Sequence, residues 1–578
     1  MASRFLRFLV ELKRRKVYHV GVVYLVVGFA VAQGAEYLFQ LLEFPLAAAQ
    51  FVAILIAIGF PIALVLAWAY EVRPEEKGPA LPQEGEGKSA VASGENRQPL
   101  ESHSSPSSDT DSRPAIAVLP FDDFSPDPRD AYFAQGMHEE ILTHLQKTRG
   151  LAVRGRTSVL PYRENPKSLR DIALELDVGF ILEGSARKAG DQVRLTAQLI
   201  DARKDEHLWA ENYDRPLTVK NLISVQSDIA GKVAQAVGIV LSREEKARMK
   251  ASPTHDLQAY DHYLLGRHHL HQWSLKDLET GLRTLEQAVE IDPAFAQGHA
   301  GVAYAYSVLA AWGQPPEDTW PQARAAAERA LSLDDTQAEA HNALALEALS
   351  YRYDWVAADE GFRRALRHNP NSVEALDWLA IMACGVWGRM EEGRVYGLRA
   401  LKADPLSLTI RYHSALLKIW FGEFDEALTT FDELKESGSG LFLGRHGRAY
   451  VRMAQGDYEE ALVEMESAME LADERTMIFV GILGYLYGRL GREAEARSQL
   501  GRLDQKAAEG VYVSPVPRAQ IHAGLGETDE AITLLEEAYE RRTHWMIHLG
   551  NIPWTFEELR DEPRFQELLE KLDFPRLR

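Results

Sequence analysis

The chain has 578 residues, of which 64 are Lys or Arg and 85 are Asp or Glu, so its formal net charge at pH 7 is −21. This length is too great for one hydrophobic core and predicts several domains, while the acidic balance argues against nucleic acid as a partner. The single cysteine, Cys384, excludes an internal disulfide and a cysteine-rich metal site.

The amino-terminal part has the pattern of a membrane anchor. Six basic residues fall within positions 1–16, and two long apolar stretches follow them. Since a crossing takes roughly 20 residues, the stretches at about 18–42 and 46–70 predict a two-helix transmembrane hairpin. A cleaved signal peptide is the alternative, because Ala30-Val31-Ala32 resembles a cleavage site. With the basic residues inside, we expect a multi-pass protein of the bacterial inner (cytoplasmic) membrane, with its carboxyl-terminal domains in the cytoplasm and the lipid bilayer around the hairpin.

Residues 1–72 are therefore assigned to the basic amino terminus and the hairpin, and residues 73–113 to a disordered linker. Pro, Gly, Ser and Glu dominate the linker, which has almost nothing to bury. Gly87-Lys88-Ser89 resembles the end of a phosphate-binding loop, but Pro82 stands where that motif needs its first glycine. A nucleotide-binding loop is not expected there.

Residues 114–243 predict an α+β domain. An apolar, β-branched run at 115–121 predicts a strand, and further strands are expected at 151–158 and three times between 179 and 215. A final amphipathic helix closes the domain. The first helix, at about 130–147, is predicted from four apolar residues that share one face: Phe133, Met137, Ile141 and Leu145.

At these residues the chain resembles the TolB-like, or FlgO-like, amino-terminal domain of bacterial signalling proteins. The resemblance is carried by IAVLPF (116–121), YFAQGMHEEI (132–141), LEGSARKAGDQVRLTAQLIDA (182–202) and HLWAENYDR (207–215). Such proteins place the domain between an output or membrane module and carboxyl-terminal helical repeats, sometimes with a cyclase, kinase or winged-helix module in front. No such output is recognised here, and the family offers no agreed catalytic residues, so neither an enzymatic nor a DNA-binding role is carried over.

Two features of this domain are candidate sites. A cluster of four carboxylates after the first strand could hold a metal or act as acid and base: Asp122, Asp123, Asp127 and Asp130. The interpretation that we favour is a polar loop and a helix cap. Trp209 could stack on a base or a sugar, but alternation with Leu208 and Ala210 favours a half-buried strand. We therefore predict no catalytic residue, cofactor or metal in this domain.

The second half of the chain is repetitive. Small residues recur in steps of 34 or 35, after a first step of 42, at Gly281, Ala323, Ala358, Gly393, Ala427, Ala461, Ala496 and Ala531. Such a period resembles tetratricopeptide repeats, about eight of them over residues 256–545, which implies an all-α superhelical solenoid of helix pairs. Small residues at these positions would let the paired helices approach closely. Residues 546–578 are interpreted as a carboxyl-terminal helical cap.

Two groups in the repeats could bear chemistry. His268, His269 and His271 lie close enough to ligate zinc, but without a third ligand at helical spacing or a nearby cysteine, a solvated helix is favoured. Cys384 could be a nucleophile only with a base beside it, and a small core residue is the favoured interpretation.

The predicted fold class is therefore multidomain, with a transmembrane hairpin, an α+β TolB-like domain and an all-α tetratricopeptide-repeat solenoid. Since stacked helix pairs create a concave surface suited to peptides, we expect a membrane-anchored signalling or scaffolding protein, not an enzyme, that recruits a protein partner in the repeat groove. Its partner-binding residues and oligomeric state are not predicted. One alternative is a sensor whose TolB-like domain binds a nucleotide or another small molecule, with the repeats as transmitter. An unrecognised enzyme is the other.

Overall fold

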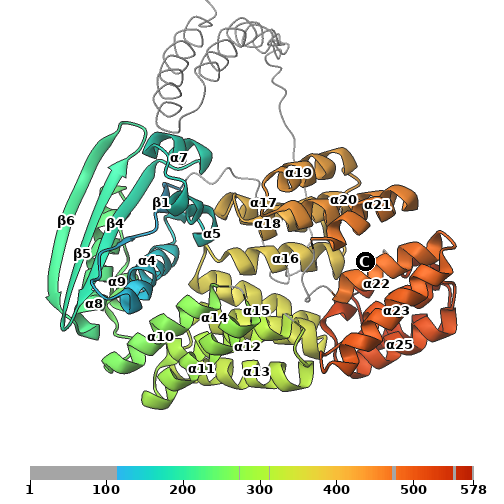
Figure 1. Cartoon of the computed structure of the whole chain (residues 1–578). Coiled ribbons are helices and arrows are strands. Elements are labelled where there is room, and N and C mark those ends of the chain that lie inside the picture. Colours follow the sequence, from blue (N-terminus) through green and yellow to red (C-terminus); the bar gives the residue numbers. More distant parts are fainter. Residues whose placement is uncertain (1–112, 273, 312, 472–476, 551–554, 576–578) are drawn as a thin grey trace, which may run out of the picture. The chain divides into compact units, whose positions relative to one another are not determined.

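The computed structural model describes residues 113–575, except 273, 312, 472–476 and 551–554. All of these residues belong to one compact unit. In this unit a sheet domain at residues 115–236 precedes a long series of helices (Figure 1).

The predicted fold class needs a correction at its first element. Among the residues that the structure describes, no helix is long and apolar enough to cross a membrane. The longest α-helices, α8 (Val219–Ala236) and α13 (Pro316–Leu333), have 18 residues each and contain charged side chains, whereas a span takes roughly 20 apolar residues. The two predicted spans, at about 18–42 and 46–70, lie outside the described residues. The hairpin is therefore removed from the fold class, and the inner-membrane localisation that depended on it is not supported.

The sheet has a mixed topology. Its strand order is β3-β1-β4-β5-β6, and β2 also pairs with β4. β1 is parallel to β3 and β4, whereas β4, β5 and β6 are antiparallel. The expected strand at 151–158 is reduced to two residues because helix α5 begins at Arg156. The strands are β1 (Ala115–Val118), β2 (Asp122–Asp123), β3 (Ala152–Val153), β4 (Phe180–Ala189), β5 (Gln192–Asp201) and β6 (Glu206–Pro216).

Helices pack on both faces of this sheet. Ile116 and Val118 of β1 belong to the core under α4 and α8, whereas Ala117 belongs to the core on the other face, as the alternation of side chains along a strand requires. The predicted apolar face of α4 is confirmed, because all four of its residues are at most 1% exposed. The helices are η1 (Pro128–Asp130), α4 (Ala131–Gln146), α5 (Arg156–Val159), α6 (Pro161–Glu164), α7 (Leu169–Glu175), α8, and α9 (Arg243–Lys250).

Helix pairs follow, and they form a solenoid of the tetratricopeptide kind. The first helices of the pairs are α10 (Leu257–Leu270), α12 (Ala296–Ala311), α14 (Ala338–Glu347, extended by η2, Ala348–Arg352), α16 (Val373–Gly385), α18 (Leu408–Trp420), α20 (Leu441–Gln455), α22 (Met477–Arg489) and α24 (Pro515–Gly524). The second helices are α11 (Leu275–Ile291), α13, α15 (Trp355–His368), α17 (Met390–Ala403), α19 (Phe424–Glu436), α21 (Tyr458–Met469), α23 (Glu493–Ala508) and α25 (Thr528–Glu540).

The predicted register of small residues is confirmed in these pairs. Each of the eight lies in a second helix and is buried. Gly393 departs from alanine for a local reason: a Cβ there would lie 2.1 Å from the sulfur of Cys384. The thiol thus fills the space that alanine would take, and burial raises its pKa to about 12, which fits the core residue that the sequence favoured.

Several first helices pack against the first helix of the next pair, as α12 does against α14 and α22 against α24, so we place the first helices on the inner face of the solenoid. The carboxyl-terminal segments η3 (His544–Leu549), η4 (Glu557–Leu559) and α26 (Pro563–Leu572) follow the last pair. They reach the third pair: the indole of Trp355 donates to the Leu572 carbonyl at 2.8 Å, and the hydroxyl of Tyr353 donates to the Thr543 carbonyl at 2.9 Å.

The register predicts how a substitution in a second helix acts. Ala461→Trp in α21 should lower the free energy of unfolding by about 1–3 kcal/mol, because Ala461 is fully buried between paired helices and the larger ring overpacks them. Glu459→Ala, at an exposed position of the same helix, should change it by less than about 0.5 kcal/mol. Urea unfolding of both variants measures the difference, and equal effects would refute the register.

Candidate protein-binding surface

Helix α4 is the element that joins the sheet domain to the repeats. Its residues from Tyr132 to Leu142 are all buried, although only one face of the helix is apolar. That apolar face packs on the sheet, and the remaining side meets α10, the first helix of the solenoid. The polar side chains of α4 must therefore find their hydrogen bonds on the inner face of the repeats.

Glu139 holds the centre of this contact. Its carboxylate lies 2.8 Å from the guanidinium of Arg156 in α5 and 3.0 Å from Nε2 of His271 at the end of α10. Burial alone would raise the pKa of the Glu139 carboxyl, but His271 and Arg156 outweigh it and hold the pKa well below its usual value. Burial lowers the pKa of His271 itself, against the opposing effect of the Glu139 carboxylate, and the Nε2–H of His271 donates a hydrogen bond to that carboxylate. Beside them, His268 bonds to the amide oxygen of Gln135 at 2.9 Å.

The neighbouring Glu140 has a different environment. It accepts hydrogen bonds from Gln297 in α12, at 3.0 Å, and from the hydroxyl of Tyr263 in α10, at 3.3 Å. No cation pairs with it within 4 Å among the described residues. Burial is therefore the largest influence, and it raises the pKa of the Glu140 carboxyl.

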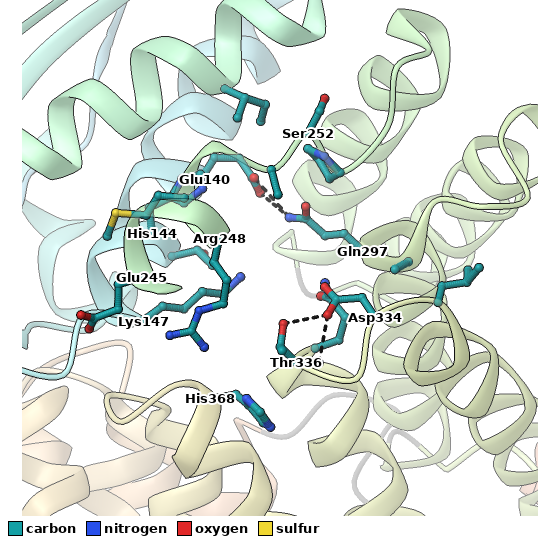
Figure 2. A pocket seen from close by; sticks show the side chains of 18 of the residues that line it. Glu140, His144, Lys147, Glu245, Arg248, Ser252, Gln297, Asp334, Thr336 and His368 are labelled. Atoms are coloured by element: carbon teal, nitrogen blue, oxygen red, sulfur yellow. Dashed lines mark hydrogen bonds between the residues drawn. The ribbon is translucent and has the colours of Figure 1, made fainter. Parts of the chain in front are cut away.

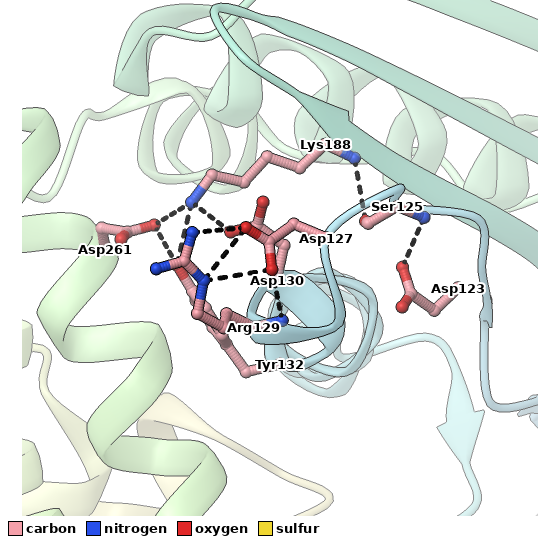
Figure 3. A network of polar contacts seen from close by, with 8 residues as sticks. All are labelled: Asp123, Ser125, Asp127, Arg129, Asp130, Tyr132, Lys188 and Asp261. Carbon is pink, nitrogen blue, oxygen red and sulfur yellow. Dashed lines mark hydrogen bonds and ion pairs between the residues drawn. The ribbon is translucent and has the colours of Figure 1, made fainter.

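A second polar cluster joins β4, α4 and α10 (Figure 3). The amine of Lys188 lies 3.1 Å from Asp130 and 3.0 Å from Asp261 of α10, and it donates to the hydroxyl of Tyr132 at 2.9 Å. That hydroxyl in turn donates to Asp261 at 2.6 Å. Burial disfavours the charged amine, but its bonds to Tyr132 and Asp261 outweigh burial and raise the pKa of Lys188.

The loops between later repeats bind the other end of the domain. Asp404, after α17, accepts hydrogen bonds from the hydroxyls of Thr157 and Ser158 and, at 2.8 Å, from the Ser158 amide. Asn371, after α15, donates to the carbonyl of Gln146 at 2.8 Å and to that of Leu151 at 3.0 Å. The sheet domain is thus bound by residues from at least three repeats.

Apolar side chains complete the junction. One hydrophobic core runs from β1 and α4 through α8 into α10, α11 and α12. At Gly136 a Cβ would approach Leu264 of α10 to 3.0 Å, so α4 and α10 are close here. We conclude that the sheet domain and the first repeats form a single packed body.

A pocket of about 430 Å³ opens beside this junction. Its walls come from α4, α9 and the segment after α9 on one side, and from the loops of the first three repeats on the other (Figure 2). Lys147 and Arg248 extend into it from the sheet-domain side, opposite Asp334, Thr336 and Gln297. Within the described part of the chain, no ion pair is formed by Lys147 or Arg248.

Another pocket lies among the later repeats, and none of its described lining residues belongs to the sheet domain. The first helices α16, α18, α20, α22 and α24 line it together with η3, and its volume is about 220 Å³. This aromatic pocket, as we call it from here on, has no described lining residue in common with the contacts that hold the sheet domain.

The structure gives most of the predicted site residues structural roles. Asp123 accepts from the Ser125 amide at 3.0 Å, and Asp127 pairs with Arg129 at 2.6 Å (Figure 3), as expected of a polar loop. In the searched ranges, 113–575 with their four gaps, no group of three His, Cys, Asp or Glu residues could hold a metal ion. Trp209 is half-buried in β6, in agreement with the strand interpretation.

The prediction for the histidine cluster was wrong. His268 and His271 were expected on a solvated helix, but both bind side chains of α4. Sequence reasoning also missed Gln135, Glu139 and Glu140, because polar residues of an amphipathic helix are ordinarily exposed. No local signal marks them, because their partners in the repeats lie 123 to 157 residues further along the chain.

The comparisons with known proteins match parts of the chain. The family model described as "HilA/YgeH-like transcriptional regulator, second domain" matches residues 112–231, which contain the sheet. A protein of Rhizobium meliloti (strain 1021) named "Putative adenylate cyclase 3" is 34% identical over 261 residues, a match that covers 44% of this chain and 43% of the relative. The chain thus spans less than half of the curated relative. Neither match confirms the TolB-like assignment.

The matches to solved structures are weak, and their TM-scores lie below 0.5. A tetratricopeptide repeat protein from Parabacteroides merdae ATCC 43184 is 15% identical with a TM-score of 0.31, covering 52% of this chain and 100% of its own. YrrB, "a TPR protein with an unusual peptide-binding site", is 18% identical with a TM-score of 0.25, covering 33% and 93%. A human IFIT1 dimer with m7Gppp-AAAA is 14% identical with a TM-score of 0.38, covering 60% and 76%. The solenoid described above therefore rests on the helix pairs themselves.

Replacing the adjacent residues Glu139 and Glu140 of α4 by glutamine, one at a time, should affect the free energy of unfolding in different ways. Glu139→Gln should lower the free energy of unfolding at pH 7.5 on the order of 3 kcal/mol, because it leaves the half-buried Arg156 without its partner. Glu140→Gln should leave it unchanged or raise it, because the amide keeps the bonds from Gln297 and Tyr263 without burying a charge.

The pH dependence should differ in sign as well. The pKa of Glu139 is lowered on folding, so its stabilisation is present above the ordinary value of 4.5 and fades as pH falls. The pKa of Glu140 is raised, so stability is lost as pH rises through it. Urea unfolding of the wild type and of both variants is compared at pH 4.5 and 7.5. The loss of stability in Glu139→Gln and the relative gain in Glu140→Gln should both be larger at pH 7.5. If the free energies of unfolding of both variants change with pH in the same direction relative to the wild type, the environments described for the two glutamates are contradicted.

Proposed function

We propose that the protein is a signalling scaffold that does not itself catalyse a reaction. It recruits a protein partner through the half of the inner face that the sheet domain leaves open. The single observation that carries this proposal is that side chains of the repeats already bind one polypeptide, helices α4 and α5 of the sheet domain. A surface that holds one polypeptide with such contacts is chemically suited to hold another.

Two further observations support a regulatory role. The sheet domain matches a domain of transcriptional regulators, and 261 residues match a protein named as a cyclase. The net charge of −21 supports a protein partner over a nucleic acid. In this proposal the sheet domain fixes the repeats in one arrangement, and the open half of the groove presents the binding surface.

Partner retention should depend on the aromatic pocket. Leu416→Glu in α18 places a charge on the pocket wall, which should abolish retention of partners that the wild type captures after crosslinking in its own cells. Leu398→Glu, at a position that is 60% exposed on α17, is the matched control and should retain them. Quantitative mass spectrometry of the captured proteins compares the variants, and identical partner sets for both would count against the groove.

The pocket of Figure 2 favours a second candidate function, a small-molecule sensor in which the repeats transmit the signal. Its volume of about 430 Å³ lies within the roughly 300–1000 Å³ of small-molecule sites. Because both domains contribute side chains, a ligand there would contact the sheet domain and the repeats at once. In this candidate Lys147 and Arg248 bind an anionic group of the ligand, whereas Glu140, Glu245 and Asp334 in the same lining face its neutral or cationic groups.

This candidate predicts a ligand-dependent rise in thermal stability. A panel of nucleotides, phosphates and carboxylates at millimolar concentration should contain at least one compound that raises Tm, because a ligand that binds only the folded state stabilises it. Arg248→Ala should remove the rise, whereas Lys246→Ala on the same helix α9 should keep it. If no compound of the panel raises Tm, the sensor function is refuted.

A further inference from the structure

The aromatic pocket has an unusual chemical composition. Among its 19 described lining residues none is Asp, Glu, Lys or Arg, although these types make up 26% of the chain. Four of the lining residues are histidines. Burial lowers the pKa of His446 and of His548 to about 3 and that of His544 to about 4, so these three imidazoles are neutral.

The remaining histidine does not make the pocket charged. His413 lies 2.7 Å from Asp377 of the preceding first helix, α16. Burial would lower the pKa of His413, but this carboxylate outweighs burial and raises it. A positive charge on His413 therefore has a carboxylate partner 2.7 Å away. The described lining residues therefore offer no unpaired charge to an occupant, and a charged occupant would lose its hydration without gaining a partner.

Aromatic rings provide most of the wall. Trp378, Trp420 and Trp545 are each half-buried and belong to α16, α18 and η3. On the opposite side, the ring of His446 lies 4.3 Å from that of Phe479 and 4.5 Å from that of Tyr450, in edge-to-face geometry. Such rings favour another aromatic ring as a neighbour, in offset or edge-to-face contact.

The size of the pocket selects among neutral occupants. At about 220 Å³ it is smaller than the roughly 300–1000 Å³ that drug-sized molecules and cofactors occupy. It can accept one large side chain, and the groove around it can accept the peptide that bears the side chain. Large rings in desolvated pockets commonly dominate the affinity of protein interfaces.

We propose that the aromatic pocket binds the ring of a tryptophan, tyrosine or phenylalanine in an uncharged segment of a protein partner. This inference rests on the proposed scaffold function and specifies the chemistry of the partner. The anchor enters between α16, α18 and α20, and the flanking peptide follows the inner face.

A host–guest peptide series tests the anchor. Fluorescently labelled Gly-Ser peptides with one variable central residue are titrated with the full chain, and binding is followed by polarisation to millimolar concentration. Peptides with a central Trp, Tyr or Phe should bind saturably and on the order of tenfold or more tightly than those with Leu, Ala or Lys. Trimethyllysine at the centre should bind no better than Lys.

Two tryptophan substitutions locate the site. Ile381→Trp fills the pocket from α16 and should abolish the preference for aromatic peptides, whereas Leu398→Trp on the exposed side of α17 should preserve it. Thermal melts verify that both variants are folded. Sedimentation of the chain alone tests the other occupant, a second copy, and a dimer that Ile381→Trp dissociates would overturn the inference.

The outcomes separate this inference from the function on which it rests. The aromatic anchor is refuted if the peptide series shows no preference for aromatic residues or shows a preference for trimethyllysine. If Leu416→Glu still abolishes partner capture in that case, the scaffold function is retained without the anchor. An aromatic preference that Ile381→Trp does not affect overturns the placement of the site. If both glutamate variants still capture the partners, the scaffold function is refuted, whatever the peptide series shows.

Discussion

The arrangement of the described residues depends on one constraint, the burial of helix α4 on all sides. An amphipathic helix on a sheet ordinarily leaves its polar side in water. In α4 that side carries Gln135, Glu139 and Glu140, each less than 10% exposed, and a buried polar group without a partner costs about 1–3 kcal/mol. His268, His271 and Gln297 of the repeats supply those partners. The two parts therefore fold as one body.

This packing decides what the inner face of the solenoid can do. Where α4, α5 and the loop residues Asn371 and Asp404 meet, the groove is filled by the chain's own domain. Helices α16, α18, α20, α22 and α24 carry the aromatic pocket, whose described lining contains no Asp, Glu, Lys or Arg. In the proposed scaffold, one part of the groove supports the sheet domain and the open part binds the partner. The rigid support lowers the entropy cost of binding at the open part.

Periodic features of this architecture could be predicted from the sequence. The small-residue register at Ala427, Ala461 and Ala496 and the apolar face of α4 report local packing, which repeats along the chain. Contacts between distant segments could not be predicted. Nothing local distinguishes the buried Glu139 from an exposed glutamate, and Asp404 resembles a loop residue until its neighbours at Thr157 and Ser158 are known. The apolar pattern at about 18–42 and 46–70 led to a transmembrane hairpin that the described residues do not support.

Hydrogen–deuterium exchange across a urea series tests the central claim, that the sheet domain and the first repeats are one cooperative body. Helix α4 should exchange as slowly as α10 and α12, and all three should lose protection at the same urea concentration, because buried contacts couple them. If α4 loses protection with the sheet while α10 and α12 stay protected, the sheet domain is an independent unit, the inner face is free along its length, and this account is contradicted.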